Sequence, residues 1–426
     1  MPFNRLTLAQ YLGSSGLYLF AISGFINQGG VYAGLGLMLI GSLVIADRAW
    51  GDLRREPAFP LAVIFTVYIV LRGVAAMQTW PDQPAAHFLA ATWDLVAIGG
   101  LFTLLVGWWL GGDRRRIALV LQLAVLSLLL GVLKGIDWRH FVNSMVNRPL
   151  FGMGNGAGLF ALIAITGLLI FRSSPLFAGG WQQRWLSSLS VKAIITVLFL
   201  VFTAVFVLSQ TRAAWFAALL VLPVVFVLML RNDGGVQKKW VARFEIVALA
   251  VLVLGVSLGA GTIAKRLGDE QTSMMLLFSG DLHSLPVSSV SYRVWLWQDA
   301  LQRIAEHPML GWGAGSAPLL IREVGVPGVL GHYHNLYLQL AVELGLVGVG
   351  LFALWLVLLV KAATAAWREG RMGFDSLLFL GALLAIFLIV SFFQLRHDDE
   401  RGQYLLILGG ALALTFRLCR SPPERE

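Results

Sequence analysis

A succession of apolar segments, each about as long as a membrane-spanning helix, constrains this chain more than any other feature of its sequence. A helix needs about 20 apolar residues to cross a bilayer. Such segments occur at residues 10–27, 30–46, 58–76, 88–111, 117–134, 153–171, 192–210, 212–230, 244–262, 334–360, 374–393 and 402–417. We therefore expect an all-α polytopic membrane protein with about twelve transmembrane helices, forming a single integral membrane domain over residues 1–426.

The composition supports the same class of protein. The chain is 58% hydrophobic and only 13% charged, whereas about a quarter of the residues of a typical soluble domain are charged. The formal net charge is +9, but Lys and Arg accumulate in the cytoplasmic loops of membrane proteins. We therefore predict membrane lipids and no nucleic acid as partners. The single cysteine, Cys419, excludes an intrachain disulfide.

The distribution of the 32 Lys and Arg residues predicts the orientation. Of these, 20 lie on the side of the N-terminus: at Arg5, in the predicted loops near residues 48–55, 114–116, 172–192, 231–243 and 361–371, and in the C-terminal segment 417–425. The basic side of a membrane protein faces the cytoplasm. An even number of spans then places both termini in the cytoplasm.

One predicted loop, residues 263–333, is long and lies on the non-cytoplasmic side between the ninth and tenth spans. Loops longer than about 12–15 residues are usually functional or disordered. This loop is rich in apolar and aromatic residues, so we favour a functional, folded loop over a disordered one. Helical spacing predicts a helix from Tyr292 to about Glu306, with Ser291 as its N-cap and His307-Pro308 as its end. We expect the loop to be a partly helical cap.

The glycine-rich stretch 311–316 follows this helix. Its backbone N–H groups are candidates for an anion-binding nest, and a plain turn that returns the chain to the bilayer is an equal alternative. Glycines further along, Gly345 and Gly348, are expected to allow close approach of helices.

Ionisable residues occur in the non-cytoplasmic parts of several predicted spans. They are Arg72, Asp94, Lys134, Arg212 and Glu343. Charges inside spans are costly and usually face water or the protein interior, so the pattern indicates a polar vestibule. Glu343 needs a buried partner, for which Lys134 and Arg72 are candidates.

The stretch 331–348 carries the most specific motif. His334 and Asn335 are followed, after nine intervening residues, by Gly345 and Gly348. This pattern resembles the signature of the O-antigen ligases, bacterial membrane enzymes that attach O-polysaccharide to lipid A-core. The resemblance also covers the twelve-span layout and the long loop before the motif. It implies that the His lies at the periplasmic mouth of a helix and that the glycines lie inside the membrane.

The resemblance implies three catalytic residues: His334, Arg212 and Arg293. Arg212 lies in the short turn between the seventh and eighth spans, where the family keeps an arginine, and an arginine fork suits a diphosphate. Snorkelling to lipid headgroups is the structural alternative. Arg293 is taken as the second arginine, with Arg266 and Arg322 as alternatives.

The role of His334 has two interpretations. It is either a hydrogen-bonded structural residue or a group that orients or deprotonates a hydroxyl, which an unperturbed pKa of about 6.5 permits; the motif favours the second. Asn335 is expected to fix the imidazole or to contact sugar. We also assign substrate binding to Arg322, Asp398 and Asp399.

A metal site is the alternative chemistry for this region. His332 and His334 together with Asp398 and Asp399 have the donor types of a zinc site. Basic residues flank the two aspartates, which is typical of an ordinary charged loop. We predict neither a metal nor a cofactor.

The resemblance implies a GT-C-like inverting glycosyltransferase of the bacterial inner membrane, acting in lipopolysaccharide biosynthesis. Its donor is undecaprenyl pyrophosphate-linked O-antigen, its acceptor is a sugar hydroxyl of lipid A-core, and its active site is periplasmic. An O-antigen polymerase and a protein O-oligosaccharyltransferase share this donor. The spacing of Gly345 and Gly348, and the absence of a large extra periplasmic domain, favour the ligase.

A lipid-linked glycan transporter or flippase is the alternative from another class. Such a protein is expected to have midplane charges or broken helices in paired positions. The sequence shows neither feature.

Overall fold

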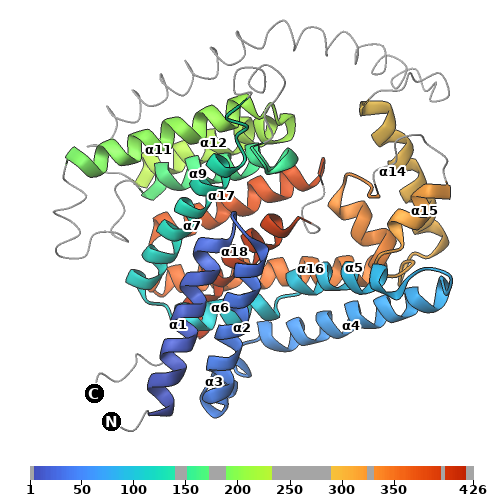
Figure 1. Cartoon of the computed structure of the whole chain (residues 1–426), viewed down its shortest axis with the longest axis horizontal. Helices are drawn as coiled ribbons and strands as arrows, with labels where there is room; N and C mark the ends of the chain where they lie inside the picture. Colours follow the sequence, from blue (N-terminus) through green and yellow to red (C-terminus); the bar gives the residue numbers. More distant parts are fainter. Residues whose placement is uncertain are drawn as a thin grey trace, which may run out of the picture.

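The computed structural model describes residues 4–139, 151–171, 189–232, 289–323, 331–394 and 399–418. These ranges form a bundle of helices and contain no strand (Figure 1). The helices are α1 (Arg5–Ser23), α2 (Gln28–Val44), α3 (Ala46–Leu53), α4 (Ala58–Thr79), α5 (Ala85–Ile98), α6 (Leu101–Leu110), α7 (Arg114–Lys134), η1 (Gly154–Gly156), α9 (Ala157–Phe171), α11 (Leu189–Leu208), α12 (Arg212–Asn232), α14 (Ser289–Glu306), α15 (Ala317–Glu323), α16 (Leu336–Arg368), α17 (Phe374–Ser391) and α18 (Glu400–Leu418).

Several of these helices are long and apolar enough to cross a membrane. Among the described residues there are six: α4, α5 with α6, α7, α12, α16 and α17, or up to seven if the bent pair α2 and α3 is one span. This confirms an all-helical polytopic membrane protein. The count of twelve remains a prediction, because α1, α9, α11 and α18 coincide with predicted spans without meeting the same test, and span 244–262 lies outside the described residues.

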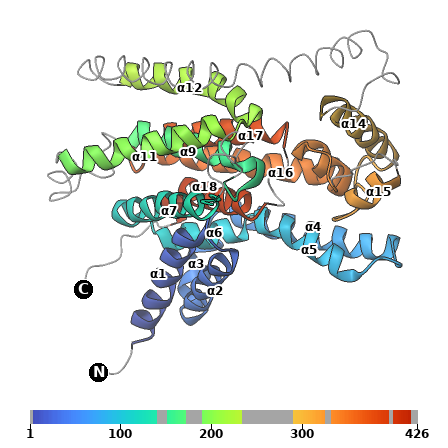
Figure 2. The ribbon, with the colours of Figure 1, turned by 45° about the horizontal axis from the view of Figure 1, so that its top comes forward.

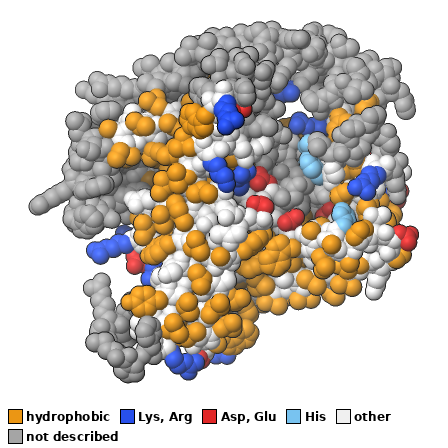
Figure 3. All heavy atoms as spheres, in the orientation of Figure 1, with side chains coloured by type: hydrophobic (Ala, Val, Ile, Leu, Met, Phe, Trp, Pro, Cys, Tyr) orange, Lys and Arg blue, Asp and Glu red, His pale blue; other side chains and the backbone are white. Residues whose placement is uncertain are grey.

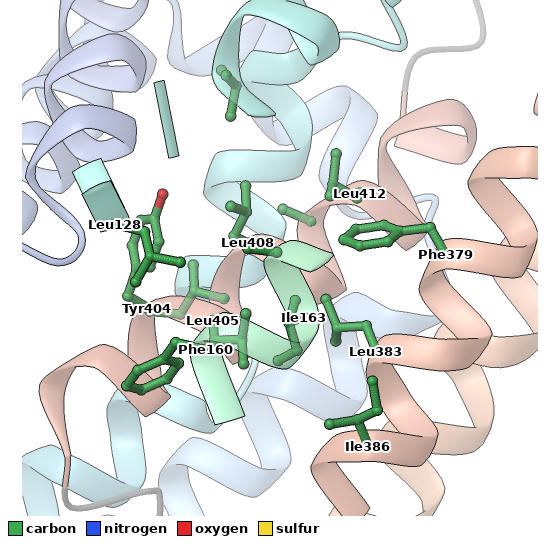
Figure 4. Packing of buried hydrophobic residues seen from close by; sticks show 14 of the residues in the cluster. Leu128, Phe160, Ile163, Phe379, Leu383, Ile386, Tyr404, Leu405, Leu408 and Leu412 are labelled. Carbon is green, nitrogen blue, oxygen red and sulfur yellow. The ribbon is translucent and has the colours of Figure 1, made fainter. Parts of the chain in front are cut away.

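Small residues and aromatic rings build the main core. Gly16 and Gly34 bring α1 and α2 so close that a Cβ on either would lie 2.6 Å from the carbonyl oxygen of the other, as is common between membrane helices. Tyr404 of α18 is buried against Phe20, with ring centroids 4.9 Å apart, and against Phe25 at 5.4 Å. Figure 4 shows Tyr404 among apolar side chains of the neighbouring helices.

The predicted loop helix is present as α14. It ends at Glu306, directly before His307-Pro308, so the predicted end is confirmed. It begins at Ser289, which makes the prediction of Ser291 as N-cap wrong: Ser291 lies inside the first turn and is fully buried. The short helix α15 follows the glycine-rich stretch, so the described part of the cap is folded.

Helix α16 is broken at Gly345, whose backbone has φ 65° and ψ −174°. The break frees backbone carbonyls that a continuous helix would use. The N–H of Trp312 donates to the carbonyl of Val342 at 2.7 Å, and the N–H of Gly313 donates to the carbonyl of Glu343 at 2.8 Å. The glycine-rich stretch therefore supplies the donors that α16 lacks.

The N–H groups freed on the other side of the break are satisfied in the same way. Leu346 donates to the carbonyl of Pro308 at 2.9 Å, and Val347 donates to the carbonyl of Met309 at 3.2 Å. A Cβ on Gly345 would lie 2.3 Å from the Met309 oxygen. The segment 308–313 is thus inserted into the break and ties the cap to α16.

These contacts correct three expectations. The prediction of an anion-binding nest is wrong for Trp312 and Gly313, because their N–H groups already donate to carbonyls of α16. Gly345 accommodates a loop rather than a neighbouring helix. A broken helix is also present, which we did not predict; its free backbone groups on both sides of Gly345 pair with the backbone of residues 308–313.

Candidate active site

The candidate site lies where the chain enters α16. His334 has a left-handed backbone with φ 54°, which is uncommon for a residue other than glycine. Asn335 follows as the N-cap of α16, and its Oδ1 accepts from the N–H groups of Tyr337 at 2.9 Å and Leu338 at 3.1 Å. The expected position of the His at the mouth of a helix is confirmed. Because strained conformations of this kind gather at functional sites, the geometry makes His334 a candidate.

His332 supports the position of His334. The backbone N–H of His334 donates to Nδ1 of His332 at 3.2 Å, and the two ring centroids are 4.2 Å apart. Nδ1 of His332 is therefore an acceptor, so a neutral His332 carries its proton on Nε2. Among the described residues, no group of three or more His, Cys, Asp or Glu is placed to hold a metal ion, and Asp398 lies outside those residues.

Tyr333 holds this entry segment against the cap. It is fully buried, and its hydroxyl donates to Asp299 of α14 at 2.8 Å. Its carbonyl accepts from Trp297 at 3.0 Å, and its N–H donates to Oε1 of Gln339 at 3.1 Å. Burial raises the pKa of the Tyr333 hydroxyl, and the Asp299 carboxylate adds to the increase. The hydroxyl therefore stays a donor at physiological pH.

Helix α14, which carries Arg293, lies beside the segment that carries His334. The ring of Tyr292, the residue before Arg293, faces the imidazole of His334 with centroids 6.5 Å apart. Arg293 is half-buried and does have an interaction partner. The sequence predicted both residues, but not the Tyr292 contact between their two segments.

Arg212 is the first residue of α12, and its side chain is exposed. The preceding turn is tight: Gln210 has φ 49°, and the Thr211 carbonyl accepts the first helical bonds, from Ala214 at 2.9 Å and Trp215 at 3.1 Å. Arg212 therefore stands at the helix N-terminus, which attracts anions.

A chain of aromatic rings connects the Arg212 turn to the His334 segment. Phe216, one turn after Arg212, contacts Phe393 with centroids 6.1 Å apart, and Phe393 contacts Phe392 at 5.3 Å. Phe392 in turn contacts Trp297 of α14 at 5.5 Å and Tyr337 of α16 at 6.4 Å. Figures 1 and 2 show this end of α17 between α12 and the region of α14 and α16.

We call this side of the bundle, which holds Arg212, His334, Phe392 and Asp399, the loop face. Figure 3 shows histidine, acidic and basic side chains gathered around the loop ends of α16, α17 and α18, whereas the lower part of the view is mostly hydrophobic. On the face shown, histidine side chains thus lie near acidic and basic side chains at the loop face.

The remaining candidates have more ordinary environments. Arg322 is exposed in the last turn of α15. Oδ1 of Asp399 accepts from the N–H of Arg401 at 3.2 Å, in the manner of an N-cap. Asp398 and Arg266 lie outside the described residues.

The charges inside the predicted spans have polar neighbours. Gln339 donates to the carboxylate of Glu343 at 2.7 Å, so one partner of Glu343 is an amide. Arg72 donates to the carbonyl of Gly311 at 2.8 Å. Asp94 accepts from Gln403 of α18 at 2.9 Å. Arg72 therefore helps to fasten the segment inserted into α16.

Comparison with known proteins adds one finding. Residues 195–353 match the family model described as O-Antigen ligase, which confirms the resemblance predicted from the sequence. The match runs from α11 through α14 into α16, so it contains Arg212, Arg293 and His334. A search of the curated proteins found no match.

Proposed function

We propose that this chain, whose residues 195–353 match the O-antigen ligase family model, is a glycosyltransferase of the bacterial inner membrane. It transfers O-polysaccharide from undecaprenyl pyrophosphate to a sugar hydroxyl of lipid A-core. The observation that carries the proposal is the position of His334: a strained residue at the mouth of α16, beside the arginine-bearing helix α14, inside the matched region. Both termini are cytoplasmic and the loop face is periplasmic in this proposal.

His334 orients or deprotonates the acceptor hydroxyl. General-base assistance by a positioned histidine contributes about 10²–10⁴-fold to a rate. Its backbone is held by His332 on one side and by the capped start of α16 on the other. Asn335, the buried N-cap residue of α16, orients the imidazole of His334 and makes the first contact with a sugar.

Arg212 and Arg293 bind the diphosphate of the donor. The guanidinium groups stabilise the negative charge that develops as the glycosidic bond breaks. The acceptor oxygen attacks the anomeric carbon from the opposite side, which inverts its configuration. The diphosphate leaves as an anion, so no general acid and no metal ion are needed. In this proposal Arg322 and Asp399 contact glycan.

The bundle also offers space for a lipid chain. An apolar cavity of about 490 Å³ is lined by residues of α7, α9, α11, α17 and α18, several of which Figure 4 labels. An amphiphilic donor can place its chain among such side chains and its diphosphate at the loop face. The broken helix α16 gives little support to transport, because segment 308–313 occupies the break.

A reconstituted transfer assay tests the proposal. Purified protein in lipid nanodiscs is supplied with diphosphate-lipid-linked O-antigen and lipid A-core in the presence of EDTA, and the product is followed by gel mobility shift. We expect transfer by the wild type and none by His334→Ala. Lengthening of the lipid-linked glycan without transfer to lipid A-core would identify a polymerase instead. Loss of wild-type activity in EDTA would overturn the metal-independent mechanism.

A further inference from the structure

A second, polar cavity of about 350 Å³ lies between the turn joining α1 and α2, the helix α5 and the start of α18. Gln28, Tyr32, Glu400, Arg401 and Gln403 contribute polar side chains to its lining, and His334, Arg212 and Arg293 are not among its lining residues. The cavity is therefore separate from the candidate active site, although α18 starts on the same loop face. We call it the α18 cavity.

Tyr32 lines this cavity and has an unused hydroxyl donor. Its hydroxyl oxygen accepts from Nε2 of Gln28 at 3.0 Å and from Nε1 of Trp93 at 3.0 Å. Two accepted bonds direct the hydroxyl proton elsewhere, and within the described ranges no acceptor receives it. Gln403, opposite, is oriented by its bond to Asp94.

Glu400 and Arg401 add a carboxylate and a guanidinium. Glu400 is exposed at the edge of the cavity and Arg401 is half-buried. In the described part of the chain, neither side chain makes a hydrogen bond. The cavity thus combines a carboxylate acceptor, a guanidinium donor and a hydroxyl that can both donate and accept hydrogen bonds.

This combination fits a sugar better than an anion or an acyl chain. Sugar hydroxyls both donate and accept, so they pair with every one of these groups. A phosphate is repelled by Glu400 and its neighbour Asp399, and an acyl chain covers the polar groups of the lining without offering them hydrogen-bond partners. The ring of Tyr32, which lines the cavity and packs against Trp93 with centroids 5.8 Å apart, adds an apolar face. The volume is at the lower end of the range of about 300–1,000 Å³ for small-molecule sites.

The α18 cavity also adjoins the apolar cavity. Phe25 and Tyr404 line both of them. A polar space and an apolar space that share a wall suit the sugar and the chain of one glycolipid. We propose that the α18 cavity is a subsite for one sugar unit of a glycolipid substrate. The inference rests on the proposed function for the source of that sugar, which is either the donor glycan or the acceptor core.

A binding experiment tests the subsite without requiring transfer. Full-length protein in nanodiscs is titrated with two water-soluble probes, delipidated core oligosaccharide and delipidated O-antigen oligosaccharide, using isothermal calorimetry. We expect one probe to bind, and Glu400→Gln and Arg401→Gln each to weaken it about tenfold, because hydrogen bonds to charged groups are among the stronger ones. The probe that binds identifies the source of the sugar.

The matched control is Asp82→Asn, which removes an exposed carboxylate between α4 and α5, outside the cavity lining. It should bind as the wild type does. Gln28→Ala serves as a second cavity variant if Glu400→Gln or Arg401→Gln fails to fold. Binding of neither probe at millimolar concentration, or unchanged binding in the cavity variants, overturns the subsite. If inorganic pyrophosphate displaces the sugar probe, and Arg401→Gln abolishes this displacement, the cavity is an anion site instead. Sugar binding without any transfer activity would refute the proposed function and retain the subsite.

Discussion

The hydroxyl of Tyr333 donates a 2.8 Å hydrogen bond to the carboxylate of Asp299, across 34 residues of sequence. Asp299 also pairs with Arg303 at 3.4 Å on the same helix. Because Tyr333 directly precedes His334, this bond fixes the candidate catalytic histidine relative to the helix that carries Arg293. The cap is therefore part of the site's geometry.

Tyr333→Phe is expected to loosen this connection. The change leaves the mostly buried Asp299 with one partner fewer, which costs about 1–3 kcal/mol. We expect a lower unfolding temperature and a lower kcat for transfer. Tyr11→Phe, at a position 65% exposed, is the control and should change neither. Unchanged stability and kcat in Tyr333→Phe would show that the bond contributes nothing to the site.

The pH dependence of the same bond has a defined sign. Burial, and then Asp299, raise the folded-state pKa of Tyr333 above its ordinary value of 10.0. A raised pKa means that the contribution to stability is complete below about pH 10 and is lost as the pH rises towards the folded-state value. The difference in unfolding free energy between wild type and Tyr333→Phe should thus be constant from neutral pH to about pH 9 and decrease at higher pH. A difference that already falls between pH 7 and 9 would contradict this assignment.

Gly345→Ala is expected to expel the segment 308–313 from the break in α16. A Cβ at this position meets the carbonyl oxygen of Met309 at 2.3 Å, and the backbone has φ 65°. Strain of this kind costs about 1–3 kcal/mol, and transfer should fall because α14 shifts relative to His334. Gly350→Ala is the matched control: it lies in the same helix, and its Cβ meets nothing within 4 Å. Equal stability of the two variants would show that the inserted segment is not required.

Asn335 has a capping role and a proposed role in substrate contact, and two substitutions separate them. Asn335→Ala removes the acceptor for Tyr337 and Leu338 and should cost about 1 kcal/mol. Asn335→Ser restores a capping oxygen and should restore the unfolding temperature. We expect transfer by Asn335→Ser to remain reduced, because the amide is lost. Full recovery of transfer would assign Asn335 to capping alone.

The features that the sequence predicted correctly depend on local information. The membrane class follows from the length of apolar segments, and the end of α14 follows from His307-Pro308. The position of His334 at the mouth of a helix was implied by the resemblance of the His334, Asn335, Gly345 and Gly348 spacing to the O-antigen ligase signature. Each of these signals lies within a short stretch of the sequence.

The missed features depend on contacts between distant segments. The break at Gly345 exists because backbone groups of residues 308–313 replace those of α16, and no local pattern distinguishes this glycine from one at a helix interface. The Tyr333–Asp299 bond and the α18 cavity join residues from separate helices in the same way. Asp398, Arg266 and the predicted span 244–262 lie outside the described residues and stay predictions.

Arg212→Lys and Arg293→Lys test whether the planar fork of each arginine is required. Lysine keeps the charge but not the bidentate geometry that a diphosphate favours, so each variant should transfer at least about tenfold more slowly, which corresponds to about 1.4 kcal/mol. Arg139→Lys, at an exposed position between described helices, should behave as the wild type. If both arginines hold one diphosphate, the double variant should lose less than the product of the two single effects. If Arg293→Lys is fully active and Arg322→Lys is defective, the second arginine that binds the diphosphate is Arg322 of α15. If neither variant is defective, the diphosphate is bound by Arg212 and a residue outside α14 and α15.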